Sequence, residues 1–472
     1  MRFDIRRIGM LVGPSLFFLI LLYPTPAEMS ESAKMVLAIS VWMIVWWITE
    51  AIPVYATALL PIGLIPAMGI LPVDAIAAEY MHPIIVLLLG MFMIALAIEK
   101  SGLHKKIAFQ LIPIFGYSPK KILLGFMLTT AIISTVVMST TVVLILLPVA
   151  ATIIAAIPAE YLKKNYKIVL MLSIAYASSI GSVSTLIGSP PNLLYAGTVM
   201  ELFSHRVTFV EWSILGAPLS FAMLTICGLY MSSKVGKTDA QTAAKIKEAL
   251  VLERAKLDKI TSEQKTVLGV LIGVLALMFT APLWQPENTF VTNSVIAILG
   301  GISLFVLPKT RSESLMNWAG IERLPFGLLF LLGGGLALSL SFVESGLANW
   351  IATSFSFVSD YPMWIIVIIL VAMIMFLTNI KSNTATAAIF IPIVGSMAVL
   401  NGWNPLPILF GITAATSFAF LLPMGTPPNA LIYEKAQIPI SEMLKTGMML
   451  NLAAIALITL FTLFISSSIL NL

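Results

Sequence analysis

Long apolar segments recur along the whole chain and are separated by short polar stretches. They fall near residues 8–23, 35–49, 52–71, 83–99, 168–187, 212–232, 266–283, 291–307, 325–343, 406–424 and 446–468. A helix needs about 20 apolar residues to cross a bilayer, so the pattern predicts an all-α polytopic membrane protein with about 11 transmembrane helices. The first segment is like a signal peptide, but Pro14 interrupts it and no small-residue cleavage site follows. We therefore expect a retained first helix.

Two further apolar stretches, 121–157 and 362–400, are each long enough for two passes and carry a polar island in the middle. The islands are Met138-Ser139-Thr140-Thr141 and Lys381-Ser382-Asn383-Thr384. A helix, a polar tip and a return helix predict a re-entrant hairpin whose tip lies inside the protein. The alternative is four ordinary spans with tight turns outside the membrane.

A short phrase that breaks helices occurs twice within apolar surroundings. It reads Gly188-Ser189-Pro190-Pro191-Asn192 and Gly425-Thr426-Pro427-Pro428-Asn429. Each proline pair removes backbone donors and interrupts a helix. Unwound backbone at membrane depth must face protein or a solvated cavity. A matched pair of broken helices in two halves of one chain indicates a transporter binding site.

Composition and charge support this class of protein. The chain is 59% hydrophobic and only 10% charged over 472 residues, which excludes a soluble domain of this size. Of the 27 Lys and Arg residues, only Lys34 and Arg206 fall outside if the N-terminus is cytoplasmic, and Lys381 falls within the membrane. The positive-inside rule thus predicts a multi-pass protein of the plasma (inner) membrane, with hairpins that enter from opposite sides. The basic residues are spread over the loops and form no single patch for nucleic acid. Cys227 is the only cysteine, so the chain cannot form an intramolecular disulfide, and the three histidines are not spaced like metal ligands.

The two halves of the sequence are related. Leu87-Leu88-Leu89-Gly90 and Ser101-Gly102-Leu103 match Leu331-Leu332-Gly333-Gly334 and Ser345-Gly346-Leu347 at one offset, which also maps Pro148 onto Pro392. The hydrophilic linker 234–265, with a helix-compatible pattern at 244–250, separates the halves. An odd number of crossings between them predicts inverted repeats.

Hairpin tips and unwound helices together supply hydroxyl, amide and backbone N–H groups that can bind a carboxylate. Helix N-termini add positive dipole ends, and released carbonyls can coordinate Na⁺. The alternative for any single Ser or Thr is a hydrogen bond back to its own helix. No nucleotide-binding loop is present, which disfavours a primary pump. No catalytic pairing occurs at depth, so we expect no enzyme activity.

Across nearly its whole length the chain resembles the divalent-anion/sodium symporter family of dicarboxylate and citrate transporters. The resemblance rests on Ser382-Asn383-Thr384-Ala385-Thr386-Ala387, on both Pro-Pro-Asn phrases and on Trp46-Trp47-Ile48-Thr49-Glu50-Ala51-Ile52-Pro53. It implies substrate and cation contacts at Ser382, Asn383, Thr384, Ser189, Pro190, Thr426 and Pro427. It also implies sodium sites framed by the Pro-Pro phrases, near Gly188, Asn192, Gly425 and Asn429, with no other cofactor.

The same resemblance implies a homodimer in which a transport domain moves as an elevator against a scaffold. The scaffold would comprise residues 1–106 and 266–361. The transport domain would comprise residues 107–233 and 362–472, joined to the rest through the linker 234–265.

Two departures from the family pattern bear on coupling. The first tip has Met138-Ser139-Thr140, or Ser139-Thr140-Thr141 in a shifted register, so an Asn amide is missing in either case. Lys381 adjoins the second tip. It either snorkels into water or replaces a bound Na⁺ as a fixed counter-charge for a dianion.

The leading interpretation is a secondary transporter of C4–C5 dicarboxylates such as succinate, malate, fumarate or 2-oxoglutarate. A tethered cation would make the return of the empty carrier unfavourable. Lys381 therefore favours sodium-independent exchange over the alternative, sodium-coupled symport. A cation or oxyanion antiporter of the wider ion-transporter superfamily is the second alternative, although the hairpins contain no carboxylates.

Overall fold

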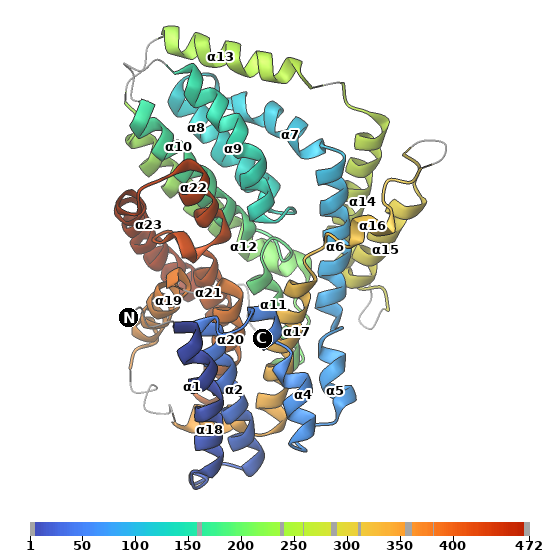
Figure 1. The fold of residues 1–472 in the computed structure, drawn as a ribbon, viewed down its shortest axis with the longest axis vertical. Helices are drawn as coiled ribbons and strands as arrows, with labels where there is room; N and C mark the ends of the chain where they lie inside the picture. The colour runs from blue at the N-terminus through green and yellow to red at the C-terminus, as the bar shows by residue number, and fades with distance from the viewer. Residues whose placement is uncertain are drawn as a thin grey trace.

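The structure is a computed structural model that describes residues 5–157, 163–236, 240–257, 259–284, 290–309, 313–354, 361–380 and 382–466. In these ranges the chain forms a bundle of helices (Figure 1). The first half contains α1 Ile5–Leu22, α2 Glu31–Thr49, α3 Val54–Thr57, α4 Leu60–Ala67, α5 Val73–Glu79, α6 Pro83–Lys100, α7 Leu103–Leu111, α8 Pro119–Ser134, α9 Ser139–Ala156, α10 Lys163–Ser182, α11 Pro190–Phe203 and α12 Phe209–Ser233.

The second half begins with the linker helix. It contains α13 Ala240–Ala255, α14 Ser262–Trp284, α15 Asn293–Val306, α16 Trp318–Ile321, α17 Phe326–Glu344, α18 Leu347–Ser354, α19 Met363–Ile380, α20 Asn383–Leu400, α21 Pro405–Ser417, α22 Pro427–Ala436 and α23 Ile440–Leu460. Short 3₁₀ turns occupy Ile112–Phe115 and Pro423–Gly425, and a π-helical turn follows α23 at Phe461–Ser466.

Ten helical stretches in the described ranges are long and apolar enough to cross a membrane. The prediction of an all-α, multi-pass membrane protein is therefore confirmed. The single span predicted at 52–71 is wrong, because this stretch forms the two short helices α3 and α4. Pro61 explains the break. Its ring would clash with the carbonyl of Thr57 in a continuous helix, whereas it fits the first turn of a new one.

Both predicted hairpins are helix–turn–helix units. In the first, α8 and α9 are joined by the turn 135–138, and α10 packs along both helices. In the second, α19 ends at Ile380 and α20 begins at Asn383. Three of the ten candidate spans, α9, α19 and α20, belong to these hairpins. Helix length alone therefore does not separate hairpin helices from membrane crossings.

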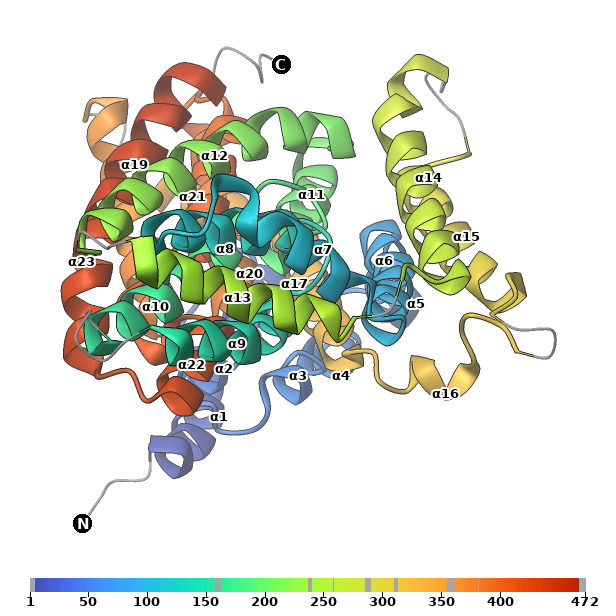
Figure 2. The ribbon, with the colours of Figure 1, turned by 90° about the horizontal axis from the view of Figure 1, so that it is seen from above.

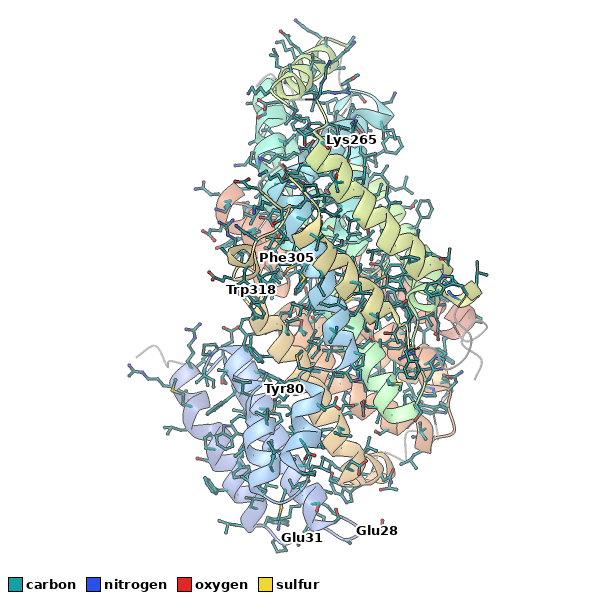
Figure 3. All side chains as sticks on the ribbon, turned by 90° about the vertical axis from the view of Figure 1, so that its right-hand side faces the viewer. Glu28, Glu31, Tyr80, Lys265, Phe305 and Trp318 are labelled. Carbon is teal, nitrogen blue, oxygen red and sulfur yellow. The ribbon has the colours of Figure 1, made fainter. Side chains whose placement is uncertain are left out.

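The linker helix α13 confirms the helical pattern predicted at 244–250. It lies across α8 and α9 at one end of the molecule (Figures 1 and 2). Ile246 and Leu250 on its inner side are buried. The linker is thus packed against the first hairpin rather than free in solution. Lys265, just after it, and Glu28 lie toward opposite ends of the molecule (Figure 3).

Helix α17 runs between the scaffold and transport parts that the sequence predicts. On one side it packs against α3, α4 and α5, and on the other against α11 and α20. Three consecutive glycines permit this close approach. A Cβ on Gly334 would lie 2.3 Å from the Ala58 carbonyl oxygen, and one on Gly335 would lie 3.0 Å from Ala388 Cβ. Tyr80, visible beside this helix in Figure 3, donates its hydroxyl to the Ala58 carbonyl at 2.6 Å.

Candidate functional site

Both hairpin tips and both unwound segments meet at one cavity of about 400 Å³. Most of the site residues predicted from the sequence line it, namely Ser139, Thr140, Gly188, Ser189, Pro190, Ser382, Asn383, Thr384, Gly425, Thr426 and Pro427. Thr141, Asn192 and Asn429 are not among the lining residues, and Lys381 lies outside the described residues. A shared internal cavity at the two tips favours hairpins over turns outside the membrane.

Four helices begin at residues that line this cavity. They are α9 at Ser139, α11 at Pro190, α20 at Asn383 and α22 at Pro427. Each helix N-terminus carries a partial positive charge of about half an electron. The starts of α9 and α20 also expose backbone N–H groups, whereas α11 and α22 begin with two prolines that have none. Four such ends around one cavity make a site for an anion without requiring a basic side chain.

The second hairpin tip is held by hydrogen bonds to neighbouring elements. The Thr378 hydroxyl lies 2.7 Å from Asn383 Oδ1 and 2.8 Å from the Thr416 carbonyl oxygen, so it donates to one of them at a time. This contact fixes the oxygen end of the Asn383 amide, and the Nδ2 end can donate to a carboxylate. Ser382 caps α20 by accepting from the Ala385 N–H.

The first hairpin tip is fixed differently. The Ser139 hydroxyl donates to the Ser178 carbonyl of α10 at 3.1 Å. Ser139 and Thr140 line the cavity, as Asn383 and Thr384 do from the other hairpin. The offset that maps Pro148 onto Pro392 also aligns Met138-Ser139-Thr140 with Ser382-Asn383-Thr384. The positions of these residues at the cavity agree with that alignment.

The two unwound segments contact each other directly. The Ser189 and Ser417 hydroxyl oxygens lie 3.3 Å apart. Unwinding begins earlier than the Pro-Pro phrases indicate, because α10 ends at Ser182 and α21 ends at Ser417. Each segment therefore frees more backbone than the phrases alone predict.

Behind the cavity wall, Asn192 and Asn429 hold these segments in the same way. Asn192 Nδ2 donates to the carbonyls of Ser182 and Thr185, and Asn429 Nδ2 donates to those of Ala419 and Leu422. The acceptors lie 10 and 7 positions before the asparagine in both cases.

Both asparagine side chains are fully buried, and neither Oδ1 atom has a hydrogen-bond partner among the described residues. An unsatisfied amide oxygen is costly in the interior. Such oxygens suit a hard monovalent cation, so the residues present fit the predicted sodium sites. The two candidate cation positions lie at equivalent places in the two halves.

Several other polar side chains near the cavity bond only to their own helix. The hydroxyls of Ser182, Thr413 and Thr416 each donate to a carbonyl three or four residues earlier. The simpler interpretation of intramembrane Ser and Thr residues therefore holds for these three. It does not hold for Ser139 or Thr378, whose hydroxyls contact other elements.

One wall of the cavity was missed by the sequence analysis. It is formed by Glu50, Val54, Tyr55, Leu88, Phe92, Pro325, Leu328 and Leu331. Glu50 also ends α2 with φ near 50°, as expected of a corner residue. It is the only charged residue among the described lining residues, and its carboxylate lies 3.5 Å from the exposed guanidinium of Arg6.

With this geometry established, comparison with known proteins identifies the family. The profile described as the sodium:sulfate symporter transmembrane region matches residues 7–469. The chain belongs to this family. The resemblance read from the sequence is thereby confirmed.

Two named transporters are similar to this chain over nearly their whole length. The chain is 35% identical to a protein named sodium-dependent dicarboxylate transporter SdcS from Staphylococcus saprophyticus, with 98% of this chain and 92% of that protein covered. The protein of the same name from Staphylococcus aureus is also 35% identical, with the same coverage. These relatives are named as transporters rather than enzymes, in agreement with the sequence analysis.

Two solved transporter structures share the fold. The Neisseria gonorrhoeae MtrF structure, described as illuminating a class of antimetabolite efflux pumps, aligns with a TM-score of 0.58 at 15% identity and covers 94% of this chain and 97% of that one. The Alcanivorax borkumensis YdaH transporter aligns with a TM-score of 0.54 at 14% identity and covers 83% and 88%.

Proposed function

We propose that this member of the sodium:sulfate symporter family is a sodium-coupled secondary transporter of small dicarboxylates such as succinate, malate, fumarate or 2-oxoglutarate. The observation that carries the proposal is the convergence of four helix N-termini on one cavity, with hydroxyl groups from both hairpins and the Asn383 amide from the second. The names of the similar staphylococcal proteins support the dicarboxylate and the sodium dependence.

In the proposed complex, the two hairpin tips hold the two carboxylates. Ser382, Asn383 and Thr384 would bind one end of the dianion, and Ser139 and Thr140 the other. The starts of α11 and α22, beside Ser189 and Thr426, would contribute the positive ends of their helix dipoles, because their first two residues are prolines without N–H donors. Hydroxyl and amide donors recognise carboxylates generally, which fits a group of dicarboxylates rather than one compound.

Charge balance favours sodium as the coupling ion. The helix ends at the cavity carry only partial positive charges, and Glu50 among the lining residues is negative, so bound cations would help to balance a buried dianion. Na⁺ bound near the Asn192 and Asn429 oxygens would supply this charge. Entry of a dianion into a negative-inside cell costs about 4.6 kcal/mol per 100 mV. Several co-transported Na⁺ ions would offset this cost.

This proposal revises the leaning toward sodium-independent exchange. That leaning rested on Lys381 as a fixed counter-charge, whereas the names of the relatives favour the sodium-coupled alternative. Sodium-independent exchange is now the second candidate. Symport and exchange differ in whether the carrier can return across the membrane without substrate. A symporter returns empty after releasing Na⁺, whereas an exchanger needs a second dianion.

We also propose, on the family resemblance, that the protein is a homodimer with an elevator-type transport domain. The close packing of α17 supports a boundary there, because Gly335 faces α11 and α20 while Gly334 faces Ala58. The inverted orientation of the two halves and a cytoplasmic N-terminus complete the proposed arrangement.

Uptake of labelled succinate into proteoliposomes tests the proposal. One set is empty and one is loaded with succinate, and external Na⁺ is compared with choline. We expect uptake into empty vesicles only with Na⁺. Uptake that requires internal succinate and ignores Na⁺ would support exchange, and Lys381→Asn would then be expected to abolish it. Labelled sulfate in parallel tests whether a different dianion is the substrate.

A further inference from the structure

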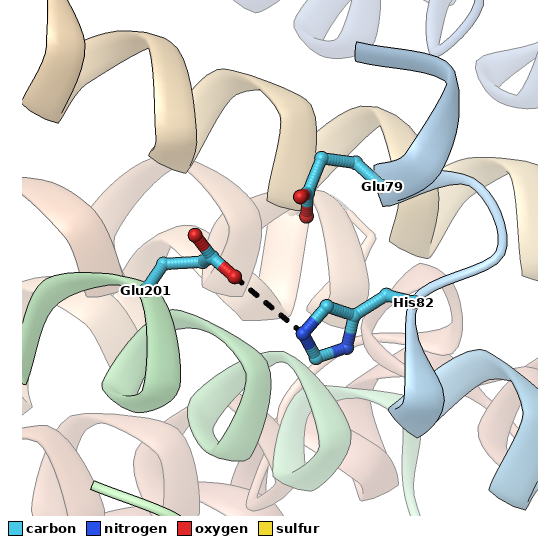
Figure 4. Close-up of side chains that lie close together, drawn as sticks. All are labelled: Glu79, His82 and Glu201. Atoms are coloured by element: carbon cyan, nitrogen blue, oxygen red, sulfur yellow. Dashed lines mark ion pairs between the residues drawn. The ribbon is translucent and has the colours of Figure 1, made fainter. Parts of the chain in front are cut away.

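Three side chains that can ligate a metal lie together away from the proposed substrate cavity. They are Glu79 at the end of α5, His82 before α6 and Glu201 in the last turn of α11. One ligand atom from each lies within 4.8 Å of the other two, and His82 Nε2 is 3.5 Å from Glu201 Oε1. Figure 4 shows the two carboxylates and the imidazole directed toward a common space.

Glu79 indicates that the cluster is built for a cation. This side chain is 7% exposed, and its Oε2 atom has no hydrogen-bond partner among the described residues. Within the same part of the chain, no Lys or Arg forms an ion pair with Glu79 or Glu201. A buried carboxylate without a partner is strongly unfavourable. A positive ion between the two carboxylates would remove this cost.

We propose that Glu79, His82 and Glu201 form a binding site for a divalent transition-metal ion of the zinc class. One imidazole and two carboxylates are a donor set that suits Zn²⁺ better than Mg²⁺ or Ca²⁺. Two ligand atoms on a tetrahedral Zn²⁺ are about 3.3 Å apart, given metal–ligand bonds of about 2.0–2.1 Å. The 3.5 Å edge between His82 and Glu201 is close to this value. Three protein ligands leave the fourth position for water.

The second ring nitrogen of His82 limits the expected affinity. Nδ1 accepts the Ile84 N–H at 3.3 Å, so the neutral ring carries its proton on Nε2. Metal binding at Nε2 moves that proton to Nδ1 and gives up this long contact. A missing outer-shell partner costs about 10- to 100-fold in affinity. We therefore expect micromolar rather than nanomolar binding.

The location of the site gives the metal a consequence for transport. Glu79 and His82 belong to the predicted scaffold, whereas Glu201 belongs to the predicted transport domain. An ion held by all three would tether these parts and slow their relative movement. This consequence rests on the proposed function, whereas metal binding itself does not.

Metal binding to the purified full-length protein tests the site directly. Binding of Zn²⁺ and Mn²⁺ is measured by competition with a chromogenic chelator, with Mg²⁺ as the negative ion. Glu79→Gln and Glu201→Gln keep the side-chain shapes, and His82→Asn keeps an acceptor for the Ile84 N–H. His205→Asn is the matched control, because His205 pairs with the single carboxylate of Glu211 at 2.7 Å.

We expect one Zn²⁺ per chain in the parent protein and in His205→Asn, with affinity weakened more than about tenfold in each cluster variant. Thermal unfolding of each variant without metal establishes that it is folded. The site is overturned if the parent protein binds no Zn²⁺ at micromolar concentration, or if folded cluster variants bind it equally well.

Transport in proteoliposomes tests the tether. We expect external Zn²⁺ to inhibit uptake, EDTA to reverse the inhibition, and Glu201→Gln to be resistant. Intact Zn²⁺ binding without inhibition overturns the tether. If the parent protein transports no dicarboxylate at all, the proposed function fails while the chelator assay still decides whether the metal site exists.

Discussion

The hydroxyl oxygens of Ser189 and Ser417 lie 3.3 Å apart and join the two unwound segments of the chain. Ser189 precedes α11 and Ser417 ends α21, so the contact links the two halves at the cavity wall. The cavity is thus shared by both halves rather than formed by one.

This contact predicts coupling between the two serines. Ser189→Ala and Ser417→Ala should each weaken succinate binding, and the double variant should lose less than the sum of the two effects. A buried hydrogen bond of this kind contributes about 0.5–1.5 kcal/mol. A double-mutant cycle on apparent succinate affinity measures the coupling. Additive losses would mean that the two hydroxyls act independently.

Replacement of Asn429 should disrupt the second unwound segment and its proposed sodium site. Asn429→Leu keeps a similar volume but removes both the donors to the Ala419 and Leu422 carbonyls and the amide oxygen proposed to bind Na⁺. Each unpaired carbonyl costs about 1–3 kcal/mol, so the unfolding temperature should fall and stabilisation by Na⁺ should disappear. Thermal unfolding at increasing NaCl concentration measures both effects.

Asn401→Leu is the control for this change. Asn401 follows α20, where its Nδ2 donates to the Met397 carbonyl outside the cavity. Its substitution should leave the Na⁺ response intact. Equal loss of the Na⁺ response in both variants would refute a specific role for Asn429.

The charge of Glu50 should act against the substrate. Because Glu50 lines the cavity, Glu50→Gln should lower the KM for succinate. Arg6→Gln removes the neighbouring guanidinium and should raise it. Both side chains are more than half exposed, so water screens them and each change should stay within about fivefold. Initial uptake rates give the two KM values, and shifts in the same direction would contradict this role.

The packing of α17 predicts a sharp difference between two glycines. Gly334→Ala should destabilise the protein by about 1–3 kcal/mol, because the new Cβ would lie 2.3 Å from the Ala58 carbonyl oxygen. Gly269→Ala on α14 meets nothing within 4 Å and should be neutral or stabilising by up to about 1 kcal/mol. Thermal unfolding of the two variants compares them. Equal changes in the two variants would contradict the role assigned to close packing at Gly334.

The sequence predicted which segments meet at the candidate cavity because prolines act locally. Pro190 and Pro427 begin α11 and α22, as expected of residues that fit the first turn of a helix and break its interior. The polar tips of the hairpins could be predicted equally well, because polar residues interrupt long apolar stretches there.

The residues at which the unwound segments begin could not be predicted from the sequence. Val183 and Phe420 are apolar and carry no turn signal, and their carbonyls are instead held by distant side chains. Trp212 Nε1 donates to the Val183 carbonyl, and the Tyr176 hydroxyl donates to that of Phe420, both at 2.9 Å. Tertiary contacts of this kind leave no local pattern in the sequence.

Clusters assembled from distant segments were missed for the same reason. Glu201 meets Glu79 and His82 only because α11 packs near the start of α6. Glu50 reaches the cavity because α2 ends beside it. In each case the packing of helices, rather than the spacing of residues along the chain, brings these side chains together.

Simultaneous uptake of labelled Na⁺ and labelled succinate into empty proteoliposomes, with the membrane potential set by a potassium gradient, tests the central claim most directly. The account predicts that the two labels enter together, with more than about two Na⁺ per dianion, so that an inside-negative potential accelerates uptake. Succinate entry without Na⁺, or entry slowed by an inside-negative potential, would contradict it.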